Sequence, residues 1–394
     1  MAYQHLYQGF LQATAPKQHY ACHSHYFWPD CTRQAMCEYW DDSAKYVDEK
    51  WSYFFATLVP ELQQRISDKL NTGHPQQIVF ASNTHELLYR VMSTLREKEP
   101  FTVVTTDSEF HSFQRQVSRL HEDKRVNLVV VASEPFATFN QRFTQAIKEH
   151  SPDLVFFSQV FFNSGFVVDD LSSIVESVTN DDTRIVIDGY HGFMAKPTDL
   201  SSIAHRVFYL AGSYKYAQGG EGACFMHVPP NCRLRPAYTG WFAEFGALDK
   251  PRAQQVQYSQ DGMRFAGATM DFTALYRLRA VLRLFEQEQL TVSKINRYVM
   301  ALQADFLHKL DQCEHPLLNS DALVVEKPSV RGHFLAFTLP DVQQTQRIAN
   351  ELKQQGLLTD HRGNKLRFGF GLYHTCESID LSAIAMMAKT DRTA

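Results

Sequence analysis

The sequence lacks the segments and the charge that would point to membranes, secretion or nucleic acid. No run of about 18 apolar residues, as a membrane-spanning helix requires, occurs in the chain. The N-terminus has neither a basic start nor a continuous apolar stretch, so we expect no signal peptide. Across 394 residues, 39 basic and 43 acidic side chains leave a net charge of −4, which disfavours nucleic acid and anionic membranes as partners. We expect a cytoplasmic protein that binds a small molecule.

Paired cysteines are absent as well. The 7 cysteines are an odd number, scattered along the chain without a Cys-x-x-Cys pair, and reduced thiols are the simplest interpretation. Cys22, His23, His25 and Cys31 lie close together in the sequence, but they lack the paired spacing of structural zinc ligands. We therefore expect no metal, and a pocket-lining loop or ordinary packing for this segment.

What the chain does contain is an alternation of short apolar runs with helical patterns between about residues 77 and 228. Several runs are apolar throughout, as parallel strands buried on both faces usually are. This pattern predicts an α/β fold, with a mostly parallel seven-stranded sheet flanked by helices. The predicted strands are 77–81, 101–106, 126–132, 153–160, 184–188, 206–212 and 222–228.

Different patterns flank this sheet on both sides. Residues 30–58 resemble one long aromatic-rich helix, for which we expect core or dimer packing. After residue 270, a helical stretch precedes apolar runs and a further helix, which is typical of a small α+β domain. We expect an N-terminal segment at 1–60, a large domain at 61–280 and a small C-terminal domain at 281–394. The runs and helix of that last part are 322–327, 332–339, 342–355 and 365–370.

The most informative segment surrounds Lys215, which lies between two tyrosines, after a predicted strand and before a glycine cluster. Lysines normally lie in solvent. In an apolar pocket the amine loses its proton more readily and becomes the nucleophile that Schiff-base chemistry requires. Taken alone, the segment is equally compatible with a structural lysine.

Asp188 supplies a second observation, because it ends the predicted strand 184–188, where open α/β sheets place their ligands. Pyridoxal phosphate (PLP) needs such an anion, since its ring is an electron sink only while its nitrogen is protonated. A helix cap is the alternative role for Asp188. Together, Lys215 and Asp188 predict a PLP site in which Lys215 holds the cofactor as a Schiff base.

A phosphate site is predicted at the start of the first helix of the sheet domain. Asn83, Thr84 and His85 follow the strand 77–81 and precede an amphipathic stretch. Free backbone N–H groups at a helix N-terminus bind phosphate, although such residues are also common caps without any ligand. The assignment of this segment to a phosphate therefore depends on the cofactor site predicted at Lys215 and Asp188.

The order of these motifs resembles the class V aminotransferase group of PLP enzymes, of fold type I, and most closely its kynureninase branch. The resemblance covers roughly residues 75–375, with Asp-x-x-His and Ser-Tyr-Lys-Tyr as its most specific parts. It implies a PLP-dependent enzyme that acts on a small amino acid. The segments that carry it are SNTHE, EFHSF, DGYH, SYKY, GW, RFxxxT and LR.

The resemblance also implies roles around the cofactor. Phe110 is expected to stack on the PLP ring, with core packing as the alternative. His191 matches the residue near the cofactor O3′ and the substrate, and Tyr214 matches a phosphate ligand. Trp241 and Thr269 match residues that reach the phosphate of a neighbouring subunit, which implies a homodimer with shared active sites.

Two further residues are expected to contact the substrate. Arg367 matches the arginine that binds the substrate α-carboxylate, and guanidinium geometry suits that clamp; a solvated arginine is the alternative. His25 lies in the segment that corresponds to an N-terminal loop over the substrate, where packing is the alternative. The freed Lys215 amine is expected to act as general base and acid at the substrate Cα.

Departures from the family pattern leave the reaction open. Residues 340–366 contain no cysteine, which argues against a cysteine desulfurase. Phe110 is followed by His111 and Ser112, where kynureninases have Pro-Thr-Asp, and Phe162 replaces a family tyrosine. Three hypotheses remain: a kynureninase-like hydrolase or lyase, an aminotransferase, and a non-catalytic binding protein that kept the fold. Intact Lys215 and Asp188 speak against the third.

Overall fold

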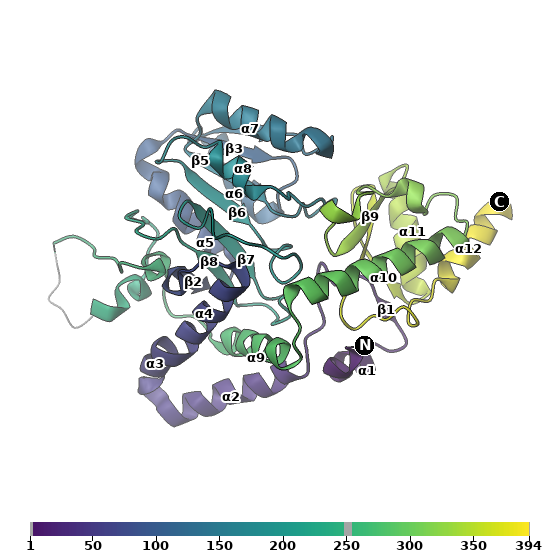
Figure 1. The fold of residues 1–394 in the computed structure, drawn as a ribbon, viewed down its shortest axis with the longest axis horizontal. Helices are drawn as coiled ribbons and strands as arrows, with labels where there is room; N and C mark the ends of the chain where they lie inside the picture. The colour runs from purple at the N-terminus through teal and green to yellow at the C-terminus, as the bar shows by residue number, and fades with distance from the viewer. Residues whose placement is uncertain (1–2, 248–253, 394) are drawn as a thin grey trace.

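A central sheet of seven strands organises the large domain of the computed structural model, which describes residues 3–247 and 254–393 (Figure 1). The strand order is β2-β8-β7-β6-β5-β3-β4. β8 is antiparallel to both of its neighbours and all other pairs are parallel, which confirms the predicted α/β fold. The strands are β2 (Ile78–Ala81), β3 (Phe101–Thr106), β4 (Val126–Val131), β5 (Leu154–Ser158), β6 (Arg184–Asp188), β7 (Val207–Gly212) and β8 (Cys224–His227).

Helices cover the sheet and explain its apolar composition. Every residue of β5, β7 and β8 is buried, because these strands have neighbours in the sheet and side chains packed on both faces. α5 packs against β7 and β8, α6 against β4, and α7 against β3 and β4. The helices of this domain include α5 (Thr84–Met92), α6 (His111–Glu122), α7 (Phe139–His150), α8 (Leu171–Glu176) and α9 (Thr273–Gln287).

α6 illustrates how sequence spacing fixes these helices on the sheet. Phe113 and Val117, one turn apart on the same face, are its buried residues. The Phe113 ring stacks on Phe156 of β5 with centroids 3.8 Å apart and planes 3° from parallel. Burial of one such side chain stabilises the fold by about 1.5–3 kcal/mol. The position of Phe110, just before α6, is fixed in consequence.

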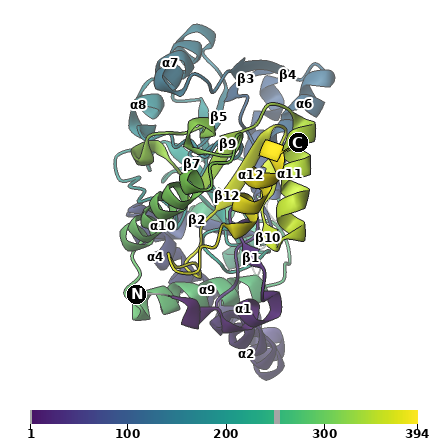
Figure 2. The ribbon, with the colours of Figure 1, turned by 90° about the vertical axis from the view of Figure 1, so that its right-hand side faces the viewer.

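The small domain carries its own sheet and core. Its three strands have the order β11-β12-β9 and are antiparallel, and a separate apolar cluster fills the space beneath α10 and α11 (Figures 1 and 2). The elements are α10 (Val292–Gln312), β9 (Phe334–Thr338), α11 (Val342–Gln354), β10 (Leu357–Leu358), β11 (Asp360–Arg362), β12 (Lys365–Gly369) and α12 (Ser382–Thr393).

The N-terminal segment connects the two domains. β1 (Gln18–His19) pairs in parallel with β10 of the small domain. A few residues later, the Tyr26 amide donates to the carbonyl oxygen of Tyr214 in the large domain at 3.3 Å. The segment between these contacts, residues 20–25, therefore crosses from one domain to the other.

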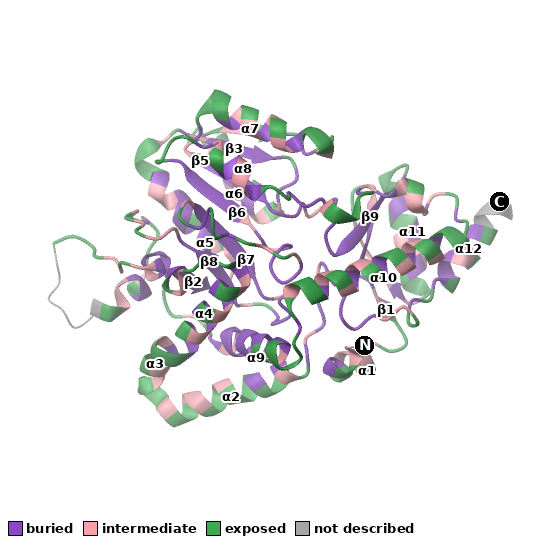
Figure 3. Ribbon diagram, viewed as in Figure 1, coloured by how far each residue is buried: buried purple, intermediate pink, exposed green. Residues whose placement is uncertain are grey.

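The predicted single helix at 30–58 is wrong. α2 (Cys31–Tyr46) ends at Val47, whose φ of 46° is a left-handed conformation that a β-branched residue rarely adopts. Short helical turns follow, and α4 (Val59–Leu70) then begins. No glycine or proline marks this break, so the sequence pattern did not reveal it. α2 packs along the buried α9, and its outer face is largely exposed (Figure 3).

The predicted strand at 322–327 is also wrong. Only Leu323 forms a β-bridge there, with Phe337. Short 3₁₀ turns at Ser320–Ala322 and Pro328–Val330 bracket the segment and interrupt the extended backbone at both of its ends. Across the described ranges, no helix is both long and apolar enough to cross a membrane.

Candidate active site

A cavity of about 220 Å³ lies at the carboxyl ends of β5, β6 and β7, the usual ligand position in an open α/β sheet. Its walls come from segments far apart in the sequence: the start of α5, the loop before α6, and the loops after β6 and β7. The structure thus brings together most of the residues predicted to bind a cofactor. Those that line the cavity are Asn83, Thr84, His85, Phe110, Asp188, His191, Tyr214 and Lys215.

Lys215 is 6% exposed and surrounded by aromatic rings. Its Nζ lies 5.4 Å from the ring centre of Phe110, 5.1 Å from that of Tyr190 and 5.7 Å from that of Tyr214. Burial disfavours the charged amine, which lowers the pKa of Lys215 to about 7 against the opposing charge of Asp188. At neutral pH a large share of the molecules therefore carries an uncharged, nucleophilic amine.

Asp188 ends β6 and borders the same cavity. Its Oδ1 accepts a hydrogen bond from the Tyr190 amide at 2.9 Å. Burial raises the pKa of Asp188, while this amide and the Lys215 charge lower it. A cation in the cavity would offset the cost of burying this carboxylate.

Glu109 is a second buried carboxylate near Asp188 to which the sequence assigned no role. It is 4% exposed and accepts hydrogen bonds from Thr106 Oγ1 and Ser158 Oγ, each at 2.5 Å, and from the Ser158 amide at 3.1 Å. Burial raises its pKa to about 8, and the charge of Asp188 acts in the same direction. Its contacts fix the loop that holds Phe110.

The start of α5 combines a cap with a set of free amides. The Asn83 side chain accepts from the Glu86 amide at 2.9 Å, so Asn83 caps the helix as well as lining the cavity. His85 is held from outside by Gln116, whose amide nitrogen lies 2.5 Å from its Nδ1. The remaining first-turn N–H groups have no partner within the helix and suit a phosphate.

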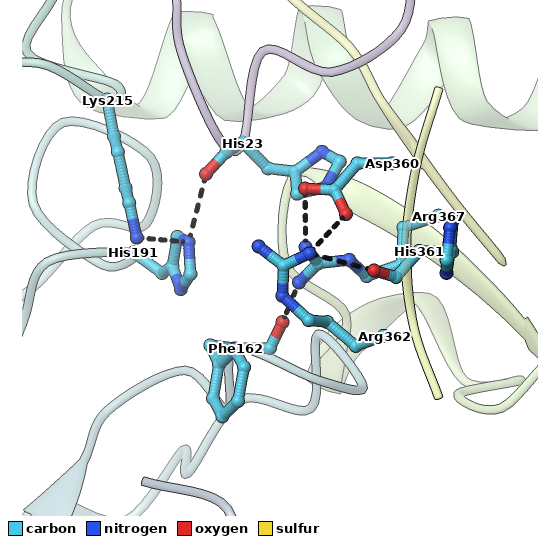
Figure 4. A network of polar contacts seen from close by, with 8 residues as sticks. All are labelled: His23, Phe162, His191, Lys215, Asp360, His361, Arg362 and Arg367. Atoms are coloured by element: carbon cyan, nitrogen blue, oxygen red, sulfur yellow. Dashed lines mark hydrogen bonds and ion pairs between the residues drawn. The ribbon is translucent and has the colours of Figure 1, made fainter. Parts of the chain in front are cut away.

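His191 connects Lys215 to the N-terminal segment (Figure 4). Its Nε2 lies 2.7 Å from Lys215 Nζ and 3.1 Å from the carbonyl oxygen of His23. One ring nitrogen cannot accept from the amine and donate to the carbonyl at the same time, so the two contacts are alternatives. Burial and the neighbouring Lys215 charge hold the pKa of His191 well below its usual range, and the ring is neutral.

In the N-terminal segment, His23 is buried beside the small domain and His25 is not. The His25 side chain is exposed, and its ring lies 5.7 Å from that of Tyr214. His23 is 1% exposed, stacks on Phe334 at 4.7 Å, and places its Nε2 3.7 Å from Asp360 Oδ2. The sequence does not distinguish the buried histidine from the exposed one, because the loop has no periodicity that indicates its inner face.

Arg367 is 2% exposed and lies behind the cavity wall rather than in it. Its Nη2 is 2.7 Å from Asp360 Oδ2, and its Nη1 donates to the carbonyl oxygen of Phe162 (Figure 4). Asp360 and Arg367 face each other across β11 and β12. This ion pair was not predicted. The positions of Asp360 and Arg367 on the two strands of one hairpin could have indicated it.

Trp241 and Thr269 lie outside the cavity. The indole Nε1 of Trp241 donates to Thr269 Oγ1 at 3.2 Å, and the indole is 37% exposed. An expected contact with a neighbouring subunit thus stays a prediction. As for metals, the described residues contain no group of three or more His, Cys, Asp and Glu side chains arranged to hold one.

The sequence pattern of the aminotransferase class-V family matches residues 28–381. The chain belongs to this family. As a class-V member it is a PLP-dependent enzyme, which confirms the predicted cofactor and fold type. The buried amine of Lys215, the cavity-lining carboxylate of Asp188 and the free amides of α5 fit the aldehyde, ring nitrogen and phosphate of PLP. No curated protein sequence matches this class-V chain.

Solved structures similar to this class-V enzyme include two cysteine desulfurases and a lyase. The apo enzyme from Thermococcus onnurineus NA1 has a TM-score of 0.79 and 15% identity over 100% of this chain and 99% of its own. CsdA from Escherichia coli has a TM-score of 0.78 and 14% identity over 99% and 97%. The cystine C-S lyase C-DES, solved with cysteine persulfide, has a TM-score of 0.74 and 17% identity over 96% and 98%. At such identities the likeness extends to the fold alone.

Proposed function

We propose that this class-V enzyme cleaves a carbon–carbon bond in the side chain of a small amino acid, as a kynureninase-like hydrolase or lyase, through a Schiff base at Lys215. The observation that carries the proposal is the buried amine of Lys215, held in an aromatic cavity 2.7 Å from His191 Nε2. When bound, PLP supplies an electron sink for the carbanion at Cα.

Each cavity residue has a role in this proposal. Asp188 keeps the pyridine nitrogen protonated, and Phe110 packs against the face of the ring. The amides at Asn83, Thr84 and His85, with the Tyr214 hydroxyl, bind the phosphate. These roles are supported by the fact that all of these side chains line one cavity.

Proton transfer falls to Lys215 and His191. With a substrate amine in the site, the Lys215 amine would be free to remove the Cα proton and to return one later. The neutral His191 ring lies within hydrogen-bond distance of that amine and orients it. Arg367 binds the substrate carboxylate, and His25 approaches the substrate from the exposed side of the loop.

We also propose a homodimer in which Trp241 and Thr269 complete the partner's phosphate site, and a cytoplasmic location. The chain is proposed to divide into an N-terminal segment at 1–60, a large domain at 61–280 and a small domain at 281–394. The exposed Trp241 and its hydrogen bond to Thr269 support the first of these points.

An aminotransferase is the second candidate. It is favoured by the segment after Phe110, where Phe113, which stacks in the core on Phe156, takes the position of the aspartate of Pro-Thr-Asp. Desulfurase activity is not proposed. In the described part of the chain, the cysteine that lines the cavity is Cys224, and burial raises its pKa to about 12. A thiol of this kind is a poor nucleophile.

The test begins with an absorbance spectrum of the purified enzyme before and after borohydride reduction. We expect a band near ~400 nm, typical of a PLP Schiff base, that reduction fixes to Lys215 and that Lys215→Ala lacks. Amino acids with different side chains are then screened for keto-acid formation and for side-chain cleavage. Cleavage supports the hydrolase or lyase, whereas keto acid formed with an acceptor supports the aminotransferase. A colourless protein that takes up no PLP would overturn the proposal.

A further inference from the structure

Three charged or polar side chains form a closed cluster behind the cavity, where the two domains and the N-terminal segment meet (Figure 4). Arg367 and Asp360 come from the small domain, and His23 comes from the N-terminal segment. Arg367 and His23 share two neighbours: Asp360 Oδ2, at 2.7 Å from Arg367 Nη2 and 3.7 Å from His23 Nε2, and the Phe334 ring. We call these three residues the carboxylate cluster.

The cluster contains buried polar nitrogens without hydrogen-bond partners among the described residues. Arg367 Nε and both ring nitrogens of His23 are buried and make no hydrogen bond to any described residue. A buried polar group without a partner destabilises the fold, so such groups in native proteins call for an explanation such as a bound water, an ion or a functional role. Arg367 Nε is a donor, and both His23 nitrogens become donors when the ring is protonated, so an oxygen acceptor would satisfy them.

The cluster is separated from the cavity by one layer of residues. Phe162 lines the cavity, and its carbonyl oxygen accepts from Arg367. His191 lines it too, and its Nε2 lies 3.1 Å from the His23 carbonyl oxygen. A substrate carboxylate that reaches Arg367 therefore also approaches His23.

The charge on His23 depends on what Arg367 binds. Burial, and then the positive charge of Arg367, hold the pKa of His23 well below its usual range; His191, Lys215 and His19 add to the effect. The cluster's own carboxylate, Asp360, faces His23 and is itself paired with Arg362 at 3.0 Å. An incoming carboxylate would cancel the Arg367 charge at His23 and offer a new acceptor.

We propose that His23 is a substrate-binding residue that takes up one proton when the carboxylate of an amino acid binds Arg367. The protonated ring then donates from Nε2 towards Asp360 Oδ2, 3.7 Å away, and its positive charge attracts the bound carboxylate. The inference names a further residue of the same site and rests on the proposed role of Arg367. The proton comes from solvent, and no covalent bond changes.

A definite pH dependence follows. Carboxylate binding raises the pKa of His23, so the complex binds more protons than the free enzyme. Affinity is therefore highest at low pH, and the dissociation constant rises by up to about tenfold per pH unit between the free and bound pKa values. Outside that window the dependence disappears.

The experiment measures proton uptake directly. Benzoate serves as the probe, since it carries a carboxylate, lacks an amine and suits the aromatic walls at Phe110 and Phe162, whose ring centres are 5.7 Å apart. Titration calorimetry of the PLP-loaded enzyme in phosphate and in Tris, which differ in ionisation enthalpy, gives the number of protons exchanged. We expect about one proton taken up per benzoate, and none with His23→Asn. His205→Asn, a change at an exposed histidine, should keep the wild-type uptake.

Several outcomes would overturn the inference. Benzoate binding without proton uptake, unchanged uptake in His23→Asn, or no benzoate binding at all would each do so. If His23→Asn fails to fold, NMR of ¹³C-labelled histidine in the wild-type enzyme measures the pKa of His23 with and without benzoate instead. A pKa that does not rise when benzoate binds would contradict the inference. An intact ~400 nm band in these experiments would leave the proposed PLP chemistry standing, whereas its absence would remove both.

Discussion

Replacing Lys215 with methionine should stabilise the fold of the cofactor-free protein. The pKa of Lys215 falls from the ordinary 10.5 to about 7 in the folded chain. At pH 7 this lysine is therefore protonated in about half of the folded molecules and in nearly all of the unfolded ones. The full pKa difference corresponds to roughly 4 kcal/mol of lost stability at pH 7. Losing the 2.7 Å contact with His191 offsets about 1 kcal/mol. We expect a net gain of about 3 kcal/mol for Lys215→Met.

The sign of the pH dependence makes this prediction sharp. A lysine with a lowered folded-state pKa destabilises the fold fully below about pH 7, and the penalty fades as pH rises towards the unfolded value. The charge penalty should therefore fall to about 1 kcal/mol by pH 10, where the lost His191 contact cancels it and Lys215→Met has almost no net advantage.

Urea unfolding of both proteins between pH 7 and 10, followed by tryptophan fluorescence, measures the difference. Lys148→Met, at an exposed lysine of α7, is the matched control and should change stability by less than about 0.5 kcal/mol at every pH. Equal stability of wild type and Lys215→Met at pH 7, or a difference that does not depend on pH, would refute the argument from burial.

Four further outcomes follow from the site and the core. Asp188→Asn should keep bound PLP but lower kcat by about 10²-fold or more, since the ring nitrogen loses its counter-charge; steady-state kinetics beside the absorbance spectrum measures this. Arg367→Lys should raise KM at least about tenfold with a smaller change in kcat, because lysine cannot make the bidentate contact. Phe113→Ala should lower the free energy of unfolding by about 3–5 kcal/mol, measured in urea. Sedimentation should give a particle of twice the 45.3 kDa chain mass, and a monomer would contradict the shared site at Trp241.

The sheet was predictable because burial on both faces leaves a direct mark in the sequence. Strands such as 184–188 are apolar runs with a polar residue at one end, and the carboxyl ends of parallel strands meet at one edge. That is why Lys215 and Asp188, placed in sequence only by their strands, line one cavity in the structure.

Features without such a mark were missed or mistaken. The left-handed Val47 ends α2 with no glycine or proline beside it, so the sequence suggested a continuous helix. The pairing of His23 with Asp360 joins residues more than three hundred positions apart, and nothing local distinguishes His23 from the exposed His25. Contacts that depend on how two domains pack together cannot be predicted from a single segment of the sequence.

The N-terminal segment that crosses between the domains has a consequence for how the enzyme is made. Residues 18–26 leave the ribosome well before their partners, which are Tyr214, the strand Leu357–Leu358 and the backbone of Leu372, whose amide donates to the Tyr26 hydroxyl at 2.5 Å. The large-domain sheet can form during synthesis, but His23 cannot reach Asp360 until nearly the whole chain is available. Residues 18–26 are thus placed only after segments synthesised long after them, and a chain that ended before Leu357 would fold around an unfinished active site.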